Sequence, residues 1–270
     1  MVSIVTSLFK SDRYLDSFSE HLNNFTSELE NRNFSFEIII VANEPTDREL
    51  EFLKTFSSKP WFRSITVKRE TFYASLNRGI ASAKGQVLGF WNVDDIRFPE
   101  AVIEAEKLVK HGADVAYFPF YIKRYLTFGS FSLPVMTTKV QGQVLEFEKR
   151  KFETNMTTGP HFMFSKQAYD KVGPFDEQFK IAGDFDWSAR AARMGLSFAL
   201  GKEFSGVFRV DGNGLSAGTN QQRTAENNVV YIRIHAWDKL VAVDDVIIRG
   251  YRTKSLKFQN GFKALNLPYK

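Results

Sequence analysis

The feature that most restricts the fold of this chain is an alternation of short apolar runs with amphipathic stretches over residues 2–110. Val2–Thr6 and Phe36–Val41 are rich in β-branched and other apolar residues, as are strands that are covered on both faces. Between them, apolar residues recur at helical spacing from Leu15 to Leu29. The pattern continues with strands predicted at Ser64–Arg69 and Gln86–Trp91, and with helices predicted after Thr46, at Ala74–Ala83 and at Ala101–Lys110. This alternation predicts an α/β fold with a doubly wound, mostly parallel sheet.

The second half of the chain is less regular, and its elements are expected to be shorter. Strands are predicted at Tyr117–Leu126, Phe131–Val135 and His161–Phe164, and helices at Ser165–Val172, Asp184–Met194 and Gln221–Leu240. No repeat or linker separates a second domain. We therefore expect one domain with a nucleotide-binding part at residues 1–112, a catalytic part at 113–218 and a C-terminal helix and tail at 219–270.

The composition limits the class of protein to which this chain can belong. The sequence has no cysteine, which excludes disulfides and thiolate metal sites and favours a reducing compartment. No apolar run reaches the about 20 residues that a membrane-spanning helix needs. Residues 1–5 lack the basic and long apolar parts of a signal peptide. We therefore expect a cytoplasmic protein.

The chain carries a modest excess of positive charge, with a formal net charge of +5. Its basic residues are dispersed, which disfavours a nucleic-acid binder and suits an anionic small substrate. They become denser between Arg249 and Lys263, in the C-terminal tail. This basic tail is expected to be either a solvated surface or a peripheral contact with the anionic inner face of a membrane.

Polar residues follow several of the predicted strands at their carboxyl ends. They are Thr6, Asn43 and the run Asn92-Val93-Asp94-Asp95. In doubly wound sheets the ligand binds beyond these ends. Adjacent carboxylates repel one another unless a cation binds there, and Mg²⁺ or Mn²⁺ prefers carboxylate and phosphate oxygens. On this pair alone, an Asp-rich turn is an equally good interpretation.

Several motifs, in a fixed order, resemble family 2 of the glycosyltransferases. They are Ser3–Thr6, Ile38–Val41, Tyr73–Ile80 (YASLNRGI) with Ala83-Lys84-Gly85, Gly89–Asp95 (GFWNVDD), Gly173–Glu177 (GPFDE) and Ile181–Asp186 (IAGDFD). The resemblance covers about Val2 to Gly195. It implies a GT-A-type three-layer α/β/α sandwich with a C-terminal helical segment.

The resemblance also implies roles for single residues. Asp184 corresponds to the catalytic base of the family. Asp94 corresponds to the carboxylate that binds a divalent metal, Mn²⁺ or Mg²⁺, on the donor diphosphate, and Asp95 would support it. The residues expected to contact the donor are Thr6, Asn43, Asn77, Asn92 and Asp94, and those expected to contact the acceptor are His161 and Trp187.

Each of these roles has a structural alternative. Taken alone, Asp184 is better explained as a helix cap. His161 is equally well explained by hydrogen bonding inside a pocket, and Trp187 somewhat better by packing on its helix face. The segment Lys123–Glu153 departs most from the pattern of the nucleotide-binding half, and we assign it to acceptor recognition.

Together these features predict a metal-assisted transfer of a sugar from a nucleotide sugar, with a UDP-sugar favoured, to a saccharide or lipid-linked acceptor. Inversion at the anomeric carbon is implied by the family. The loop Ala42–Pro45 lacks the paired aspartates usual in the family, and Leu76 stands where many members have Arg. These departures leave open a non-catalytic module that binds a sugar nucleotide or a glycan. A nucleotidyltransferase is disfavoured because residues 7–10 contain no glycine for a phosphate loop.

Overall fold

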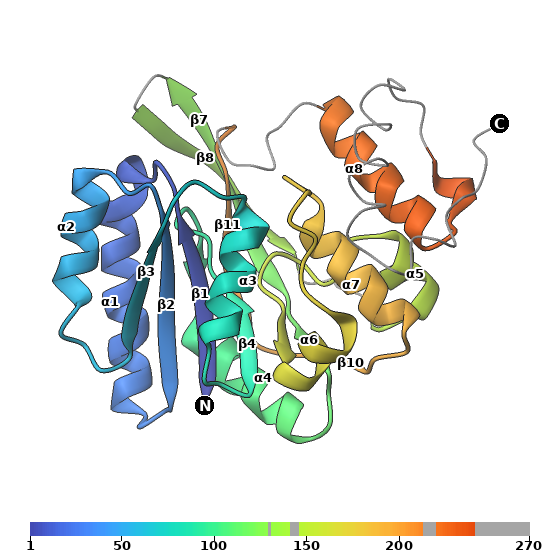
Figure 1. Ribbon diagram of the computed structural model, residues 1–270, viewed down its shortest axis with the longest axis horizontal. Helices are drawn as coiled ribbons and strands as arrows, with labels where there is room; N and C mark the ends of the chain where they lie inside the picture. The colour runs from blue at the N-terminus through green and yellow to red at the C-terminus, as the bar shows by residue number, and fades with distance from the viewer. Residues whose placement is uncertain (129–130, 141–145, 213–219, 241–270) are drawn as a thin grey trace.

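The computed structural model describes residues 1–128, 131–140, 146–212 and 220–240, and its centre is a seven-stranded mixed sheet (Figure 1). The strands, in their spatial order, are β10 (Phe198–Leu200), β6 (Val115–Tyr117), β9 (Met163–Ser165), β4 (Val87–Phe90), β1 (Val2–Leu8), β2 (Phe36–Asn43) and β3 (Phe62–Val67). Neighbouring strands are parallel except at β9, which is antiparallel to both β4 and β6. The predicted α/β fold with a mostly parallel sheet is confirmed, and the reversed β9 is an addition to it.

Helices cover both faces of this sheet. One face carries α1 (Leu15–Asn31), α2 (Asp47–Phe56) and α4 (Pro99–Lys110), and the other carries α3 (Phe72–Ser82), α6 (Lys166–Val172) and α7 (Gly183–Arg193). Successive side chains of a strand point to opposite faces. Accordingly Ile38 and Ile40 pack in the first core, and Ile39 and Val41 in the second. The predicted three-layer sandwich is therefore observed.

A second sheet of four strands, which the sequence patterns did not predict, lies beside the first. Its order is β5 (Ile96–Arg97), β11 (Gly206–Val210), β7 (Phe120–Phe128) and β8 (Phe131–Val140). The predicted strand Tyr117–Leu126 is divided between the two sheets. Pro119 lies at the division, and its missing N–H group cannot join a strand ladder. Gly206 allows β11 to approach β5, because a Cβ atom there would lie 1.9 Å from the Ile96 carbonyl oxygen.

The C-terminal part of the structure differs in length from its prediction. The expected single helix Gln221–Leu240 is α8 (Asn220–Arg233) followed by a short 3₁₀ helix, η3 (Trp237–Lys239). His235 separates them, because its φ of 59° is left-handed and cannot continue an α-helix. A 3₁₀ turn, η1 (Asp12–Tyr14), and a short helix, α5 (Lys149–Thr154), were also not predicted. The basic tail lies outside the described residues, and none of the helices within them is long and apolar enough to cross a bilayer.

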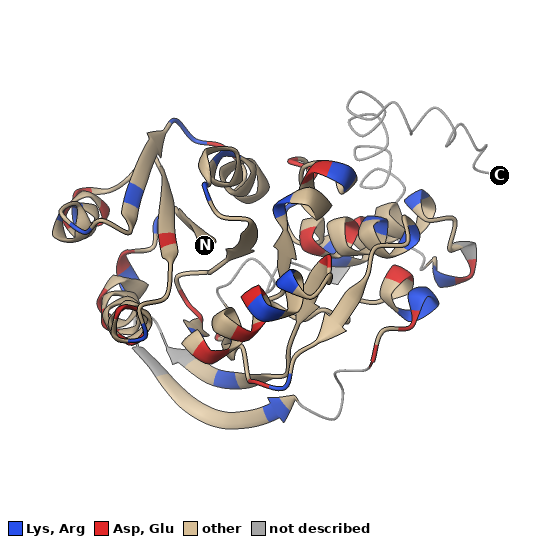
Figure 2. Ribbon diagram, turned by 90° about the horizontal axis from the view of Figure 1, so that it is seen from below, with Lys and Arg blue, Asp and Glu red and all other residues tan. Residues whose placement is uncertain are grey.

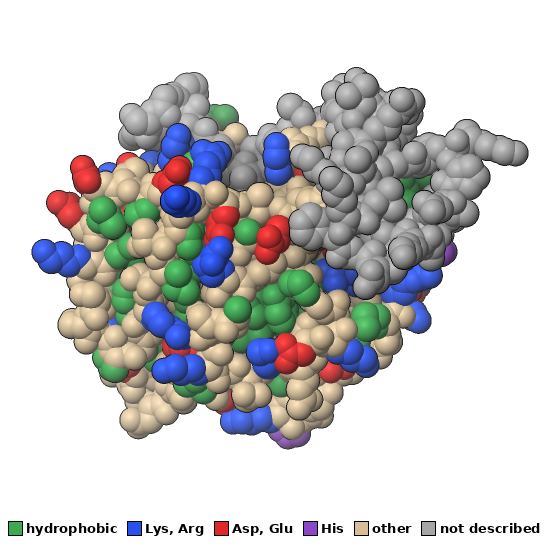
Figure 3. Space-filling model, in the orientation of Figure 1, with side chains coloured by type: hydrophobic (Ala, Val, Ile, Leu, Met, Phe, Trp, Pro, Cys, Tyr) green, Lys and Arg blue, Asp and Glu red, His purple; other side chains and the backbone are tan. Residues whose placement is uncertain are grey.

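Charged side chains are spread over the surface. Seen from below, blue and red positions follow one another along the outer helices (Figure 2). On the face drawn in Figure 3, acidic and basic side chains are interspersed around a central group of hydrophobic ones. The surface of the described residues thus shows the same dispersion of charge as the sequence.

Candidate active site

The turn that carries Asp94 is fixed at both of its ends. Val5 of β1 pairs with Phe90, the last residue of β4, so β1 continues past the end of β4 and the turn lies beside this extension. Inside the turn the Asp95 N–H donates to the Asn92 carbonyl at 3.1 Å. Immediately after it, β5 pairs with β11 of the second sheet. The turn is therefore held between the two sheets.

Asp95 is buried, and its carboxylate is used inside the protein. The Arg209 N–H donates to its Oδ1 at 2.8 Å, and Asn92 Nδ2 donates to its Oδ2 at 3.3 Å. His161 Nε2 lies 3.4 Å from the same Oδ2. Burial raises the pKa of Asp95 to about 7 despite these partners. Asp95 thus links the turn to the second sheet.

Asp94 is partly exposed and is the carboxylate of the pair that can meet a ligand. Burial is the main cause that raises its pKa to about 7, and the negative charges of Asp95 and Asp211 add to it. Arg209 acts in the opposite direction. Asp211 is itself occupied, since it accepts hydrogen bonds from Arg13, Tyr14 and Arg209. Asp94 therefore carries a charge that its surroundings do not neutralise.

This arrangement fits a divalent cation whose ligands would come partly from a protein carboxylate and partly from the phosphate oxygens of a bound diphosphate. Within the described residues, no group of three or more His, Cys, Asp or Glu side chains could hold a metal alone. Mg²⁺ is commonly bound by one or two carboxylates, with phosphate oxygens and water completing its shell. Asp94 offers one such carboxylate, partly exposed and next to Asp95 in the same turn.

Thr6 and Asn43 lie at the carboxyl ends of neighbouring strands. Thr6 is fully buried, and its Oγ1 has no hydrogen-bond partner. The Asn43 amide donates to Ser7 Oγ at 3.2 Å and to Ser75 Oγ at 2.6 Å, and its Oδ1 accepts from the Glu70 N–H at 3.0 Å. Thr6 thus keeps an unused hydroxyl group, whereas Asn43 ties the strand ends to α3.

Asn77 lies away from the strand ends, and its amide is fully engaged. Its Nδ2 donates to the Phe175 carbonyl and to Glu177, and its Oδ1 accepts from the Tyr169 hydroxyl and the Phe175 N–H. An amide group has two N–H donors and one carbonyl oxygen. The structure therefore leaves Asn77 no free donor for a ligand and assigns it to the packing of α3 against the loop before α7.

Asp184 lies in the first turn of α7, where its Oδ1 accepts the Phe185 N–H at 2.8 Å. The Tyr73 hydroxyl lies 3.3 Å from the same oxygen and donates to the Ile181 carbonyl at 2.9 Å. Gly183 permits this approach, since a Cβ atom there would lie 2.6 Å from the Tyr73 ring. Tyr73 is the second residue of α3, which follows the carboxyl end of β3, and Asp94 follows the carboxyl end of β4. Because β1 to β4 are parallel, Asp184 and Asp94 lie at the same end of the main sheet.

Burial raises the pKa of Asp184 to about 6. The Phe185 N–H and Tyr73 oppose this effect, and the charge of Glu226 reinforces it. No described cation forms an ion pair with Asp184, although its side chain is only partly exposed. A carboxyl group in this state is a candidate general base.

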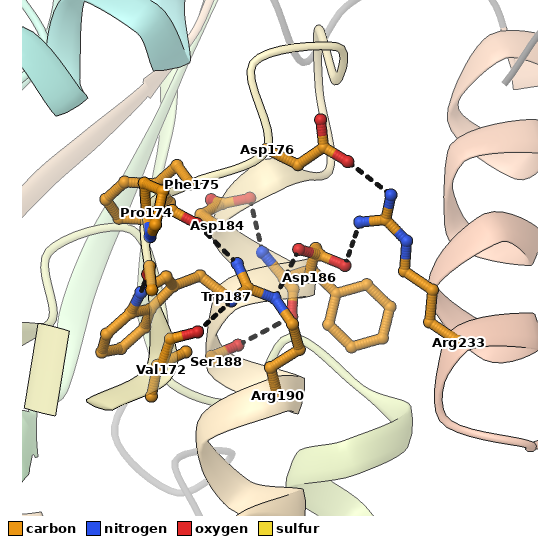
Figure 4. Close-up of polar contacts among 12 residues, drawn as sticks. Val172, Pro174, Phe175, Asp176, Asp184, Asp186, Trp187, Ser188, Arg190 and Arg233 are labelled. Atoms are coloured by element: carbon orange, nitrogen blue, oxygen red, sulfur yellow. Dashed lines mark hydrogen bonds and ion pairs between the residues drawn. The ribbon is translucent and has the colours of Figure 1, made fainter. Parts of the chain in front are cut away.

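Asp186, two residues further on, has the opposite electrostatic environment (Figure 4). It is fully buried, yet Arg233 and Arg190 outweigh the effect of burial and lower its pKa. Arg233 of α8 donates to Asp186 at 2.6 Å and also pairs with Asp176. Arg190 binds Asp186 at 2.9 Å and the carbonyls of Val172 and Pro174. Asp186 is therefore structural.

A second residue of α8 holds the segment just before α7. Glu226 is fully buried, and its carboxylate accepts hydrogen bonds from the N–H groups of Lys180, Ile181 and Ala182 at 2.8–3.3 Å. These three residues directly precede Gly183 and Asp184. Glu226 and Arg233 thus position the turn that presents Asp184.

The structure does not support the expected acceptor contacts of His161 and Trp187. His161 is buried, its pKa is held well below the usual value by burial and by Arg97, and its Nδ1 lies 3.2 Å from Ser205 Oγ. Trp187 is fully buried, and its Nε1 donates to the Gly173 carbonyl. Neither side chain is accessible to an acceptor, because the core around β9 and α7 encloses both.

Several residues around the site were missed by the sequence analysis. They are Tyr73, Arg209, Asp211, Glu226 and Arg233. Local patterns give no reason to connect Arg209 with Asp95, more than a hundred residues away. Glu226 and Arg233 carry a weak signal, because charged residues seven apart lie on one face of a helix.

The comparisons with known proteins agree with this fold. The sequence profile of glycosyl transferase family 2 matches residues 3–173. The uncharacterized glycosyltransferase MJ1057 of Methanocaldococcus jannaschii is 23% identical over 215 residues, which are 78% of this chain and 71% of the relative. Because the profile spans more than half of the chain, these sequence matches show the family.

Solved structures show the same fold at low sequence identity. Residues 1–349 of S. aureus TarS in complex with UDP-GlcNAc superpose with a TM-score of 0.63 and 17% identity, over 99% of this chain and 76% of that one. The mannosyltransferase PcManGT from Pyrobaculum calidifontis, in complex with GDP-Man and Mn²⁺, superposes with a TM-score of 0.61 and 14% identity, over 98% of this chain and 78% of that one. With its GT-A-like sandwich and its matching motifs, the chain belongs to glycosyl transferase family 2.

Proposed function

We propose that this glycosyltransferase moves a sugar from a nucleotide sugar to a hydroxyl group of a saccharide or lipid-linked acceptor, with Asp184 as the general base. The observation that carries the proposal is the pair of separate carboxyl groups with raised pKa values, about 7 for Asp94 and about 6 for Asp184, at one end of the main sheet. One suits the leaving diphosphate and the other suits the attacking hydroxyl.

In the proposed reaction, the acceptor oxygen attacks the anomeric carbon while the Asp184 carboxylate takes the hydroxyl proton. The bond between that carbon and the diphosphate oxygen breaks, which gives the new glycoside with inverted configuration and a nucleoside diphosphate. A base with a pKa of about 6 is mostly ionised at neutral pH and still accepts a proton readily. A divalent cation bound at Asp94 would stabilise the charge on the departing diphosphate.

The identity of the donor is the least constrained part of the proposal. TarS was solved with UDP-GlcNAc, and PcManGT with GDP-Man and Mn²⁺. We favour a UDP-sugar with Mn²⁺ or Mg²⁺.

Turnover of a panel of UDP- and GDP-sugars with Mn²⁺ tests this proposal. Asp184→Asn should lower kcat by about 10²–10⁴-fold, because the hydroxyl loses its general base, and should leave donor affinity nearly unchanged. Asp47→Asn, on an exposed carboxylate that opens α2, is the matched control. Equal turnover by wild type and Asp184→Asn would exclude the assigned base. Donor binding without any turnover by wild type would instead favour a non-catalytic module.

A further inference from the structure

The hairpin formed by β7 and β8 presents two different faces. The strand register pairs Leu126 with Leu133 and Arg124 with Met136, so these four side chains share one face. Tyr125 lies on the other face, where the Arg209 guanidinium lies 3.9 Å from its ring centroid. Arg209 is also the residue whose N–H group holds Asp95. One face of the hairpin is therefore part of the active-site surroundings, and the other is unpartnered in the described structure.

The unpartnered side of the hairpin carries most of the exposed large apolar side chains of the described residues. Leu126, Leu133, Val135 and Met136 are 53%, 48%, 54% and 51% exposed. β8 is also an edge strand, paired only with β7. Contiguous exposed apolar side chains are typical of a surface that binds another protein or a membrane.

The charge of this segment has one sign. Residues 115–145 contain Lys123, Arg124 and Lys139 and no acidic residue, and the hairpin strands are marked only in blue in Figure 2. The Leu126–Leu133 pair lies toward the turn of the hairpin, and the Tyr121–Lys139 pair lies toward the body of the protein. At about 3.3 Å per residue, Lys123 and Lys139 lie roughly 10–16 Å behind the apolar pair. They lie on the opposite face of the hairpin, where Lys123 Nζ is 5.5 Å from the Tyr125 ring centroid and Lys139 Nζ is 4.8 Å from that of Phe204. Both faces meet the headgroup layer only when the hairpin enters a bilayer by its end.

From these observations we propose that the β7–β8 hairpin docks on an anionic lipid bilayer. The apolar end enters the boundary between headgroups and acyl chains, a layer about 5–10 Å deep, and the cations behind it meet the lipid phosphates. Edge-to-edge pairing with a second copy is disfavoured, because Pro134 lacks an N–H group and a bulge lies between Arg124 and Tyr125. The proposal does not depend on the catalytic roles of Asp94 and Asp184.

Co-sedimentation of the full chain with vesicles tests the apolar contribution. Wild type should bind vesicles of phosphatidylcholine with 30% phosphatidylglycerol at least about tenfold more tightly than vesicles of phosphatidylcholine alone, since each cation near the surface adds to the affinity. Leu126→Ser combined with Leu133→Ser and Met136→Ser should lower this binding by about tenfold or more. Leu50→Ser, at a leucine 45% exposed on α2, is the control and should bind as wild type does.

A charge variant tests the electrostatic contribution. Lys123→Glu with Lys139→Glu should abolish the preference for anionic vesicles, whereas Lys54→Glu with Lys59→Glu, which changes the net charge equally on exposed positions of another region, should keep it. Circular dichroism checks that each variant is folded. Absence of wild-type binding, or equal binding by the hairpin variants and their controls, would overturn the proposal. A wild-type dimer that the apolar variant loses would identify the hairpin as a self-association surface and would overturn it as well.

Discussion

The turn after β4 and the first turn of α7 each carry two aspartates, but the electrostatic environments of these aspartates differ between the two regions. In the first, burial raises the pKa values of both Asp94 and Asp95 to about 7. In the second, burial raises the pKa of Asp184 only. The pKa of Asp186 is lowered, because the positive charges of Arg233 and Arg190 outweigh the effect of burial. The difference separates Asp94 and Asp184, which are partly exposed and have no described cation paired with them, from Asp95 and Asp186, whose carboxylates are bound inside the fold.

The largest expected effect tests whether Asp94 and Asp184 act on different substrates, the donor and the acceptor. Asp94→Asn should reduce kcat/KM by about a thousandfold, since a metal contact to a leaving group supplies several kcal/mol. It should also weaken Mn²⁺-dependent donor binding, which Asp184→Asn should leave intact. Isothermal titration with donor, with and without Mn²⁺, distinguishes the two. Identical loss of donor binding in both variants would contradict the division of roles.

The next effect concerns Asp186, the buried aspartate that pairs with Arg233. Arg233→Met should lower the free energy of unfolding by about 3 kcal/mol, because it leaves Asp186 and Asp176 buried without their partner. Urea unfolding measures this change. Arg48→Met, which breaks the surface pair with Asp16, serves as the control and should leave the midpoint nearly unchanged. A midpoint for Arg233→Met equal to that of the control would show that α8 is not needed to hold α7.

A partly buried carboxylate with no cation paired with it should destabilise the folded protein when it is ionised, that is, at pH values above its pKa. The folded protein binds the Asp94 proton more tightly than the unfolded chain does, so this contribution to stability falls as pH rises from about 4 to about 7. In metal-free buffer, Asp94→Asn should therefore increase the free energy of unfolding by about 2 kcal/mol at pH 8 and by little at pH 4. Thermal unfolding at both pH values measures it, with Asp47→Asn as the control. A gain independent of pH would refute the electrostatic explanation.

The smallest effect concerns the influence of Glu226 on the base. Its negative charge raises the pKa of Asp184, and that pKa of about 6 should set the acid limb of the kcat/KM profile, which reports the free enzyme. Activity should thus fall about tenfold per pH unit below this value. Glu226→Gln keeps an oxygen acceptor for the loop and removes the charge, so the limb should move to lower pH by a few tenths of a unit. Movement to higher pH would mean that the substitution acts through the loop geometry instead.

The sequence predicted the regular half of the molecule well, because burial there follows from local patterns. Ile38–Val41 reads as a strand covered on both faces, and it is one. Some boundaries depended on single contacts, such as the Thr71 hydroxyl that accepts the Ala74 N–H and starts α3 two residues before its predicted start. The second sheet was missed because β5 has only two residues and forms through pairing with distant β11.

The site was predictable only as far as the family resemblance reached. Asp94 and Asp184 were selected through motifs, and their catalytic roles remain predictions. His161 was assigned to the acceptor through the family resemblance, and Trp187 through its aromatic ring beside Asp184. Neither signal reveals burial, which depends on how α7 packs against β9. Glu226 and Arg233 were not found, since their spacing indicates a shared helix face but does not identify their partners, which lie 44 to 57 residues away.

The docking of α8 on the segment before Asp184 has a consequence for the order in which the protein matures. Chains emerge from the ribosome starting at the N-terminus, and folding proceeds in that direction. β1 to β4 can therefore pair early. The turn with Asp94 and Asp95 also needs β11 and Arg209, and Asp184 obtains its final setting only after residue 233 has been synthesised. A nascent chain that ends before α8 would hold these strands without the final setting of Asp184, so α8 completes the surroundings of the proposed base.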